Sequence, residues 1–175
     1  MSSYRSRSKN IAMVELEEIL PTTSKEEFYS LLQRQCSALL EQETDLIANT
    51  ANFTSLLYHS LPDVNWVGVY FFKNGELVLG PFQGRPACVR IALGRGVCGS
   101  AAELKSTVVV PNVHEFQGHI ACDSQSNSEI VIPLFQGNQL LGVLDIDSPI
   151  FDRFDETDRL ELEHIAGLFV GFSQL

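Results

Sequence analysis

The sequence predicts an α+β fold in which a central, mainly antiparallel sheet carries helices on one face and a ligand pocket on the other. Three observations lead to this class: two amphipathic helical segments come first, a run of strand-like segments follows, and an amphipathic helix closes the chain. Consecutive strands joined by tight turns pair antiparallel, and their apolar face needs a helical layer to cover it.

The helices are predicted from caps and apolar periodicity. Ser24-Lys25-Glu26-Glu27 has the pattern of a capping box, and the helix that follows places on one face Phe28, Leu31, Leu32, Cys36 and Leu39. A second helix is expected from about Thr44 to Tyr58, with an inward face of Leu46, Ile47, Phe53 and Leu57. The last helix begins after Asp155 as N-cap and carries Leu162, Ile165, Leu168, Phe169 and Phe172.

Between these helices, strands are expected at 65–72, 77–79, 87–92, 107–110, 129–135 and 139–147, with a short helix at 97–103. Lys73-Asn74-Gly75-Glu76 predicts a type I′ hairpin, because Asn-Gly accepts the positive φ angles of that turn. Gln136-Gly137-Asn138 predicts the turn between the last two strands.

Strand alternation sorts the side chains onto two faces. One face of the first strand carries Trp66, Gly68, Tyr70 and Phe72, opposite Val67, Val69 and Phe71. One face of the last strand carries Leu141, Val143, Asp145 and Asp147, opposite Leu140, Gly142, Leu144 and Ile146. We expect the apolar faces to meet the helices and the mixed faces, with Glu129 nearby, to line the pocket. Aromatic rings beside carboxylates suit an amine-bearing ligand, the alternative being acids that cap turns in water.

Composition excludes several classes of function. The net charge of -10 argues against nucleic acid and against an anionic membrane surface as partners. No apolar run is long enough to span a bilayer and no secretory signal is recognisable, so a cytoplasmic location is expected. Residues 1–20 have a Ser-rich head with a few basic residues and are expected to be a flexible tail. Residues 21–175 are expected to form a single domain.

No structural disulfide framework is expected among the four cysteines in such a compartment, so each is interpreted either as a buried core residue or as a residue with a chemical role. Cys36 is predicted to be a core residue of the first helix. Cys98 lies near the start of the predicted short helix, where the helix dipole would favour its thiolate. Cys88 lies between two arginines, Arg85 and Arg90, which would favour its thiolate if it is exposed, and Cys122 lies in a polar loop.

No metal site is predicted from these residues. The cysteines and histidines offer suitable ligand atoms, but no Cys-x2-Cys pair is present and the spacings of the cysteines match no compact zinc module.

Five motifs follow one another in a fixed order: Gly94-Arg95-Gly96-Val97-Cys98-Gly99, Val110-Pro111-Asn112-Val113-His114, Gly118-His119-Ile120-Ala121-Cys122-Asp123, Ser126-Asn127-Ser128-Glu129-Ile130-Val131 and Gly142-Val143-Leu144-Asp145-Ile146-Asp147-Ser148. In this order they resemble the free methionine-(R)-sulfoxide reductases, which are single GAF-domain enzymes, over about Tyr29 to Phe169. Asn112 departs from the Asp expected in that family, and we interpret it as a loop contact.

The resemblance implies a GAF-like fold and a set of roles. Cys122 would be the attacking thiol, Cys88 the thiol that resolves its sulfenic acid, and Cys98 a further thiol of the relay; which of Cys98 and Cys122 attacks first stays open. Glu129, Asp145 and Asp147 would hold the substrate's ammonium group and assist proton delivery. Trp66 and Tyr70 would enclose its methylthio end.

The resemblance also implies a partner, thioredoxin, as external reductant, which draws electrons from NADPH through thioredoxin reductase, and no bound cofactor. A homodimer is expected from the general frequency of two-fold symmetric dimers. Two other classes of function compete with the enzyme. One is a GAF sensor module that binds a small ligand such as a cyclic nucleotide without catalysis, and the other is an interaction protein that uses the acidic stretch at 152–163.

Overall fold

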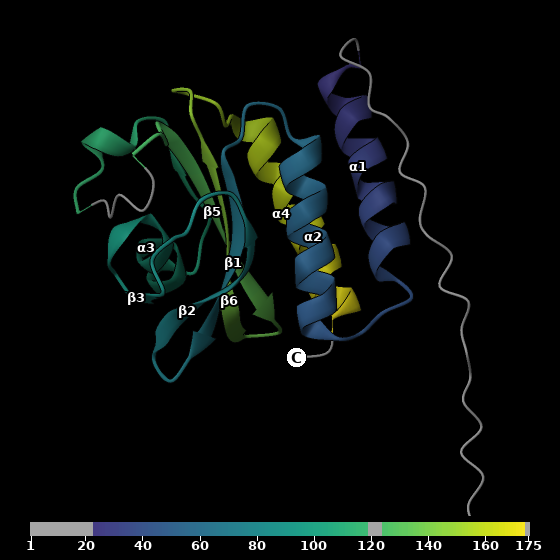
Figure 1. Cartoon of the computed structure of the whole chain (residues 1–175), viewed down its shortest axis with the longest axis horizontal. Helices are drawn as coiled ribbons and strands as arrows, with labels where there is room; N and C mark the ends of the chain where they lie inside the picture. Colours follow the sequence, from purple (N-terminus) through teal and green to yellow (C-terminus); the bar gives the residue numbers. More distant parts are fainter. Residues whose placement is uncertain (1–22, 119–123, 174–175) are drawn as a thin grey trace, which may run out of the picture.

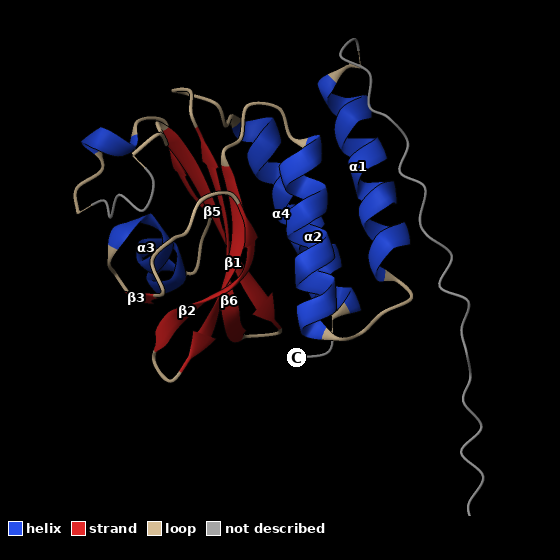
Figure 2. Ribbon diagram, viewed as in Figure 1, coloured by secondary structure: helices blue, strands red, loops and turns tan. Residues whose placement is uncertain are grey.

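The computed structural model describes residues 23–118 and 124–173 of the 175-residue chain. In Figures 1 and 2 the described part forms layers, with long helices on one side of a twisted sheet and a short helix with loops on the other. The helices are α1 (Lys25–Leu40), α2 (Leu46–Ser60), α3 (Gly96–Leu104) and α4 (Glu156–Phe172), with a 3₁₀ turn, η1, at Val113–Glu115. The tail predicted at 1–20 lies outside the described residues.

The sheet has six strands in the order β3-β2-β1-β6-β5-β4, and all its neighbouring pairs are antiparallel. The strands are β1 (Trp66–Lys73), β2 (Glu76–Gln83), β3 (Arg90–Ala92), β4 (Val108–Val110), β5 (Ser128–Gln136) and β6 (Gln139–Ser148). This confirms the predicted class. The strand expected at 87–92 is shorter than predicted and begins at Arg90, although the Val89 carbonyl still accepts a hydrogen bond from the Leu79 amide.

The predicted turns and caps are confirmed. Lys73 pairs with Glu76, and the two residues between them, Asn74 and Gly75, have φ angles of 53° and 90°, as a type I′ turn requires. Ser24 and Glu27 form the predicted capping box of α1, and Asp155 caps α4 by accepting a hydrogen bond from the Asp158 amide.

Helices α2 and α4 pack against the sheet, and α1 packs outside them, against both. The core between helices and sheet is built from apolar positions of α1, α2 and α4 and the alternate residues Val67, Val69 and Phe71 of β1. Tyr29 and Leu40 belong to the buried face of α1. The prediction for Ile47 is wrong, because this side chain lies on the outer side of α2 and is 55 % exposed.

A second, smaller apolar cluster lies on the opposite face of the sheet, under α3, and includes Trp66, Tyr70 and Val143. The predicted sides of Leu140 and Leu141 are reversed: Leu140 packs into this second cluster, and Leu141 packs with the helices. The reason is an irregularity in the pairing of β5 and β6, where Leu134 is opposite Gly142 but Phe135 is opposite Leu140. The extra residue, Leu141, shifts the alternation by one position. No helix of the described residues is long and apolar enough to cross a membrane.

Candidate active site

Three acidic side chains meet on the α3 side of the sheet because of the strand register. Asp147 lies opposite Trp66 of β1 and opposite Glu129 of β5. Asp145 is two residues earlier on the same strand, so its side chain lies on the same face, opposite Gly68 and Val131. The register thus brings together the acids and the aromatic residue that strand alternation predicted to share this face.

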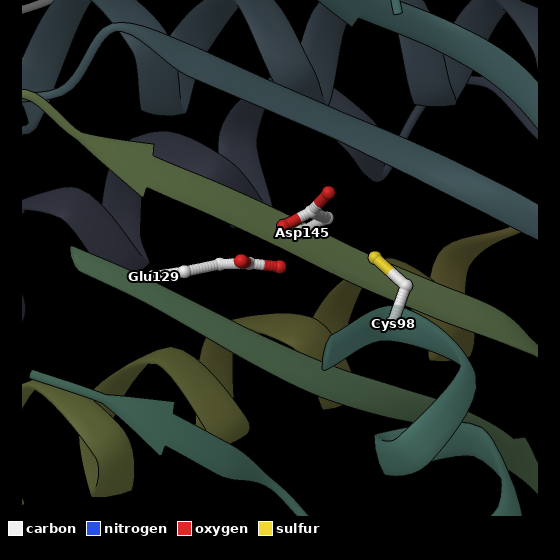
Figure 3. Close-up of side chains that lie close together, drawn as sticks. All are labelled: Cys98, Glu129 and Asp145. Atoms are coloured by element: carbon white, nitrogen blue, oxygen red, sulfur yellow. The ribbon is translucent and has the colours of Figure 1, made fainter. Parts of the chain in front are cut away.

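Helix α3 adds a thiol to the acids. The ligand atoms of Cys98, Glu129 and Asp145 all lie within 4.8 Å of one another, and Figure 3 shows the three side chains converging from α3, β5 and β6. These side chains are almost fully buried, with exposed fractions of 5 %, 5 % and 6 %. Residue 99 is glycine where the start of α3 lies against the end of β3, because a Cβ there would lie only 2.3 Å from the carbonyl oxygen of Ala92.

Burial raises the pKa values of all three groups, and neighbouring carboxylates add to the rise for Glu129 and Cys98. Burial is the main cause for Glu129, whose pKa lies well above its ordinary value, and the charges of Asp145 and Asp147 add to it. Burial also raises the pKa of Asp145, to about 6, although hydrogen bonds from Cys98 and Glu129 oppose the rise. These directions indicate that Glu129 and the Cys98 thiol hold protons, which they donate to the Asp145 carboxylate.

The expected activation of Cys98 by the helix dipole is wrong. Burial, followed by the charges of Asp145 and Glu129, raises the pKa of the Cys98 thiol well above its ordinary value. The position of Cys98 in the first turn of α3 does favour a thiolate, but this effect is small compared with full desolvation beside carboxylates. In this arrangement Cys98 is a protonated thiol.

Asp145 lacks a partner that a buried carboxylate ordinarily has. Its Oδ1 atom is inaccessible to solvent and has no hydrogen-bond partner among the described residues. A buried polar atom without a partner costs about 1–3 kcal/mol, and more when it is charged. The unpartnered oxygen of Asp145 is therefore suited to a cationic or hydrogen-donating ligand.

Aromatic side chains form the wall beside the acids. The rings of Trp66 and Tyr70 are stacked with a centroid separation of 5.9 Å, and Phe82 stacks on the other side of Trp66 at 5.4 Å. The Trp66 indole N–H donates a 3.0 Å hydrogen bond to the carbonyl oxygen of Arg85. Gly68 leaves the space for this ring, because a Cβ there would lie 2.2 Å from its Cη2 atom.

A cavity of about 20 Å³ lies at this wall, lined by Trp66, Tyr70, Arg85, Pro86, Ala87, Asp145 and Asp147. This volume holds about one water molecule. The segment Arg85–Ala87 forms part of the wall of this cavity. A larger groove, of about 520 Å³, lies between β5 and α4, but no cysteine lines it, and its lining acid, Glu163, is paired with Arg159.

The other predicted site residues are placed as follows. Cys88 is half-buried in the loop before β3 and is disulfide-bonded, whereas Cys36 and Cys98 are free thiols. Arg90, one of the two arginines expected beside Cys88, forms an ion pair with Glu76 of the neighbouring strand. Cys122, predicted as the attacking thiol, lies outside the described residues.

Asn112 has a structural role. Its side chain accepts a hydrogen bond from the His114 amide and donates one to Glu115, which caps the turn η1. This agrees with its interpretation as a loop contact.

Sequence reasoning missed three residues that shape the wall. These are Gly68 under the Trp66 ring, Phe82 stacked on that ring, and Arg85, whose carbonyl holds the indole. A glycine inside an otherwise apolar strand was the available signal for Gly68, because such a glycine often marks a close approach. Phe82 and Arg85 gave no signal, since their contacts depend on how β2 pairs with β1.

Comparisons with known proteins agree with this geometry. The GAF domain model matches residues 15–170. The free methionine-R-sulfoxide reductase of Escherichia coli is 51 % identical over 143 residues, which are 82 % of this chain and 87 % of that protein. The Staphylococcus aureus enzyme in its reduced form is 50 % identical with a TM-score of 0.80, over 82 % of this chain and 93 % of that one.

A second solved structure is similar over more of the chain. The free methionine-R-sulfoxide reductase of Neisseria meningitidis, in complex with its substrate, is 42 % identical with a TM-score of 0.84, and the match covers 90 % of this chain and 95 % of that one. A GAF fold, a buried thiol beside clustered carboxylates and identities of this size lead to one conclusion: the chain belongs to the free methionine-R-sulfoxide reductase family of GAF-domain proteins.

Proposed function

We propose that the protein reduces free methionine-(R)-sulfoxide to methionine. The observation that carries this proposal is the buried Asp145 carboxylate, which has an unpartnered oxygen and stands among further acids beside an aromatic wall. The family supports the same substrate, since relatives of 51 % and 40 % identity, from Escherichia coli and Saccharomyces cerevisiae, are free methionine-R-sulfoxide reductases.

The acids select a free amino acid. Asp145 and Asp147 line the cavity, and a substrate ammonium group there would give the buried Asp145 carboxylate a cationic partner. A methionine sulfoxide inside a peptide has an amide in place of this group and would leave the buried charge uncompensated. Trp66 and Tyr70 supply the apolar surface for the methylthio end.

The proposed chemistry needs a thiolate and a proton. The thiolate of Cys122 attacks the sulfoxide sulfur, the oxygen is transferred to the cysteine as sulfenic acid, and methionine leaves. A proton supplied to the sulfoxide oxygen makes the sulfur more electrophilic. Burial raises the pKa of Glu129, which favours its protonated form, and Glu129 is hydrogen-bonded to Asp145, which lines the cavity.

The thiol is regenerated through a disulfide. A second cysteine condenses with the sulfenic acid, releasing water, and an external dithiol then reduces the disulfide. Cys88 is proposed for the second role because it is disulfide-bonded and half-buried rather than enclosed in the core. Thioredoxin is the proposed external dithiol.

The test is NADPH consumption in an assay coupled to thioredoxin and thioredoxin reductase. The substrates are the two epimers of free L-methionine sulfoxide and the N-acetylated analogue. We expect turnover of the free R epimer only, because the S epimer misplaces its oxygen and the N-acetyl compound lacks the ammonium group. Cys122→Ser should lose turnover completely, and Cys36→Ala should keep it, because Cys36 is fully buried in the other core.

Each outcome decides a different part of the proposal. If folded and reduced protein gives no NADPH consumption with any of the substrates, the reductase function is overturned in favour of a ligand-binding sensor. Turnover of the N-acetylated analogue at the rate of the free amino acid would overturn the role of the carboxylates in selecting the ammonium group. Full activity of Cys122→Ser would move the attacking role to another thiol.

A further inference from the structure

The cluster of Cys98, Glu129 and Asp145 offers one thiol sulfur and two carboxylates that lie within 4.8 Å of one another. Each ligand comes from a different element, α3, β5 or β6, so no local sequence spacing could reveal the set (Figure 3). A metal ion bound by these atoms needs them only about 1 Å closer together than this limit, since ligands around a tetrahedral zinc are about 3.3–3.7 Å apart.

We propose that this cluster binds a thiophilic divalent cation, with Zn²⁺ as the physiological candidate, through Cys98 Sγ and one oxygen each of Glu129 and Asp145. The mixed sulfur and oxygen donor set favours Zn²⁺ or Cd²⁺ over Mg²⁺ and Ca²⁺, which take six or more oxygen ligands. Three protein ligands leave a fourth tetrahedral position for water.

A second observation, independent of the spacing, points to a ligand at this place. Asp145 is 94 % buried, as its exposed fraction of 6 % states, and its Oδ1 has no hydrogen-bond partner among the described residues. Buried acids in contact with one another are costly unless a cation compensates them. At Asp158, by contrast, Lys25 and Arg153 provide this compensation through ion pairs.

The cation would reach the cluster through the cavity, because Asp145 belongs to both. A carboxylate bound to a metal ion cannot pair with an ammonium group at the same time. Metal and substrate would therefore compete, and the metal-bound protein would be an inactive, reversible form. This competition rests on the proposed function, whereas binding of the metal does not.

The test uses Cd²⁺ as the probe, because a cadmium–thiolate bond gives an ultraviolet charge-transfer band. The protein carries Cys88→Ser and Cys122→Ser, so that Cys36 and Cys98 are the thiols that remain. We expect one Cd²⁺ per chain with a thiolate band. Adding Cys98→Ser should abolish the band, whereas adding Cys36→Ala should leave it unchanged, because Cys36 lies in the core on the other face of the sheet.

The carboxylates are tested by calorimetric titration with Zn²⁺. Asp145→Asn should weaken binding at least about tenfold, since even the loss of an outer-shell partner of a metal ligand costs roughly 10- to 100-fold. The matched control is Glu26→Gln, an exposed acid of α1 that lies beyond the other face, and it should bind as before. Circular dichroism of each variant verifies that it is folded.

Three results would overturn the metal site: no band, a band that survives Cys98→Ser, or equal Zn²⁺ affinity in Asp145→Asn and the parent protein. Methionine, which has the ammonium group but cannot react, separates this proposal from the proposed function. If methionine weakens Cd²⁺ binding, the two ligands share Asp145. If Cd²⁺ binds but methionine has no effect, the metal site stands and the ammonium site at Asp145 fails.

Discussion

Two buried aspartates, one on each side of the sheet, differ in how their charge is compensated. Asp158, at the start of α4, is fully buried and accepts hydrogen bonds from the Tyr29 hydroxyl at 2.6 Å and from Lys25 at 2.8 Å. Arg153 pairs with it at 3.3 Å. Asp145 on the α3 side has a thiol and a carboxyl group as neighbours and keeps one oxygen without a partner among the described residues.

The difference separates a structural acid from a functional one. The partners of Asp158 come from α1 and from the loop before α4, so this residue of α4 ties the two helices together. Asp145 accepts hydrogen bonds from Cys98 and Glu129, but it stays buried with one oxygen without a partner among the described residues, so a cationic ligand can stabilise it. Burial alone does not distinguish the two residues; the two cations paired with Asp158 do.

Replacing Asp158 should have the largest effect on stability. Asp158→Ala leaves the buried Tyr29 hydroxyl and the largely buried Arg153 without their acceptor, and removing one partner of a buried pair costs about 3–5 kcal/mol. Urea unfolding measures this loss. Glu156→Ala is the matched control, because this acid of the same helix is 70 % exposed and pairs with Arg159 only at the surface, where the loss of a pair changes stability little. Equal losses in both variants would remove the structural role of Asp158.

Replacing Asp147, in contrast, is expected to affect turnover and to leave stability nearly unchanged. Asp147→Asn should lower turnover of methionine-(R)-sulfoxide by one to three orders of magnitude, about the range for one acid-base or charge-stabilising group, with little change in stability. The measurement is the coupled assay with kcat and KM determined separately. Asp152→Asn is the control, since Asp152 is exposed in the loop after β6 and asparagine tolerates its φ of 52°. An unchanged rate in Asp147→Asn would exclude it from the mechanism.

The sequence predicted those parts of the site that depend on local pattern. The Asn74-Gly75 turn and the turn at Gly137 fixed two hairpins, and strand alternation then placed Trp66, Asp145 and Asp147 on one face. Alternation failed at Leu140 and Leu141, because a pairing irregularity depends on the partner strand and leaves no mark in the strand's own sequence. The hairpins depend on neighbouring residues in the sequence, whereas the irregularity depends on the pairing of two strands.

The parts that could not be predicted depend on contacts between distant segments. The approach of Cys98 to Asp145 requires the packing of α3 over β6, and the sequence shows only that Cys98 starts a helix. For the same reason the protonation state of Cys98 was predicted in the wrong direction: the dipole can be read from the sequence, but the depth of burial and the neighbouring acids cannot.

The pH dependence of stability tests the comparison most directly, with the smallest expected effect. The pKa of Asp145 is raised to about 6, so the folded state binds a proton that the unfolded state has released, and stability falls as pH rises from about 4 to 6. The contribution should be about 1–3 kcal/mol. On the other side of the sheet, hydrogen bonding to Lys25 lowers the pKa of Asp155 to about 2, so its contribution is lost as pH falls from about 4 to 2.

The two faces therefore act in opposite directions and in separate pH ranges. Urea unfolding at constant ionic strength, with wild type and Asp145→Asn in the same disulfide state, measures the contribution of Asp145 together with its coupling to Glu129 and Cys98, because titrating groups that do not interact with Asp145 cancel in the difference. The two proteins should be about equally stable near pH 4, and the variant should be the more stable near pH 7, since asparagine carries no charge to bury. A stability difference that stays constant across this range would mean that the charge of Asp145 is compensated in the folded protein, as that of Asp158 is. The unpartnered Oδ1 would then carry no free-energy cost that a ligand could remove.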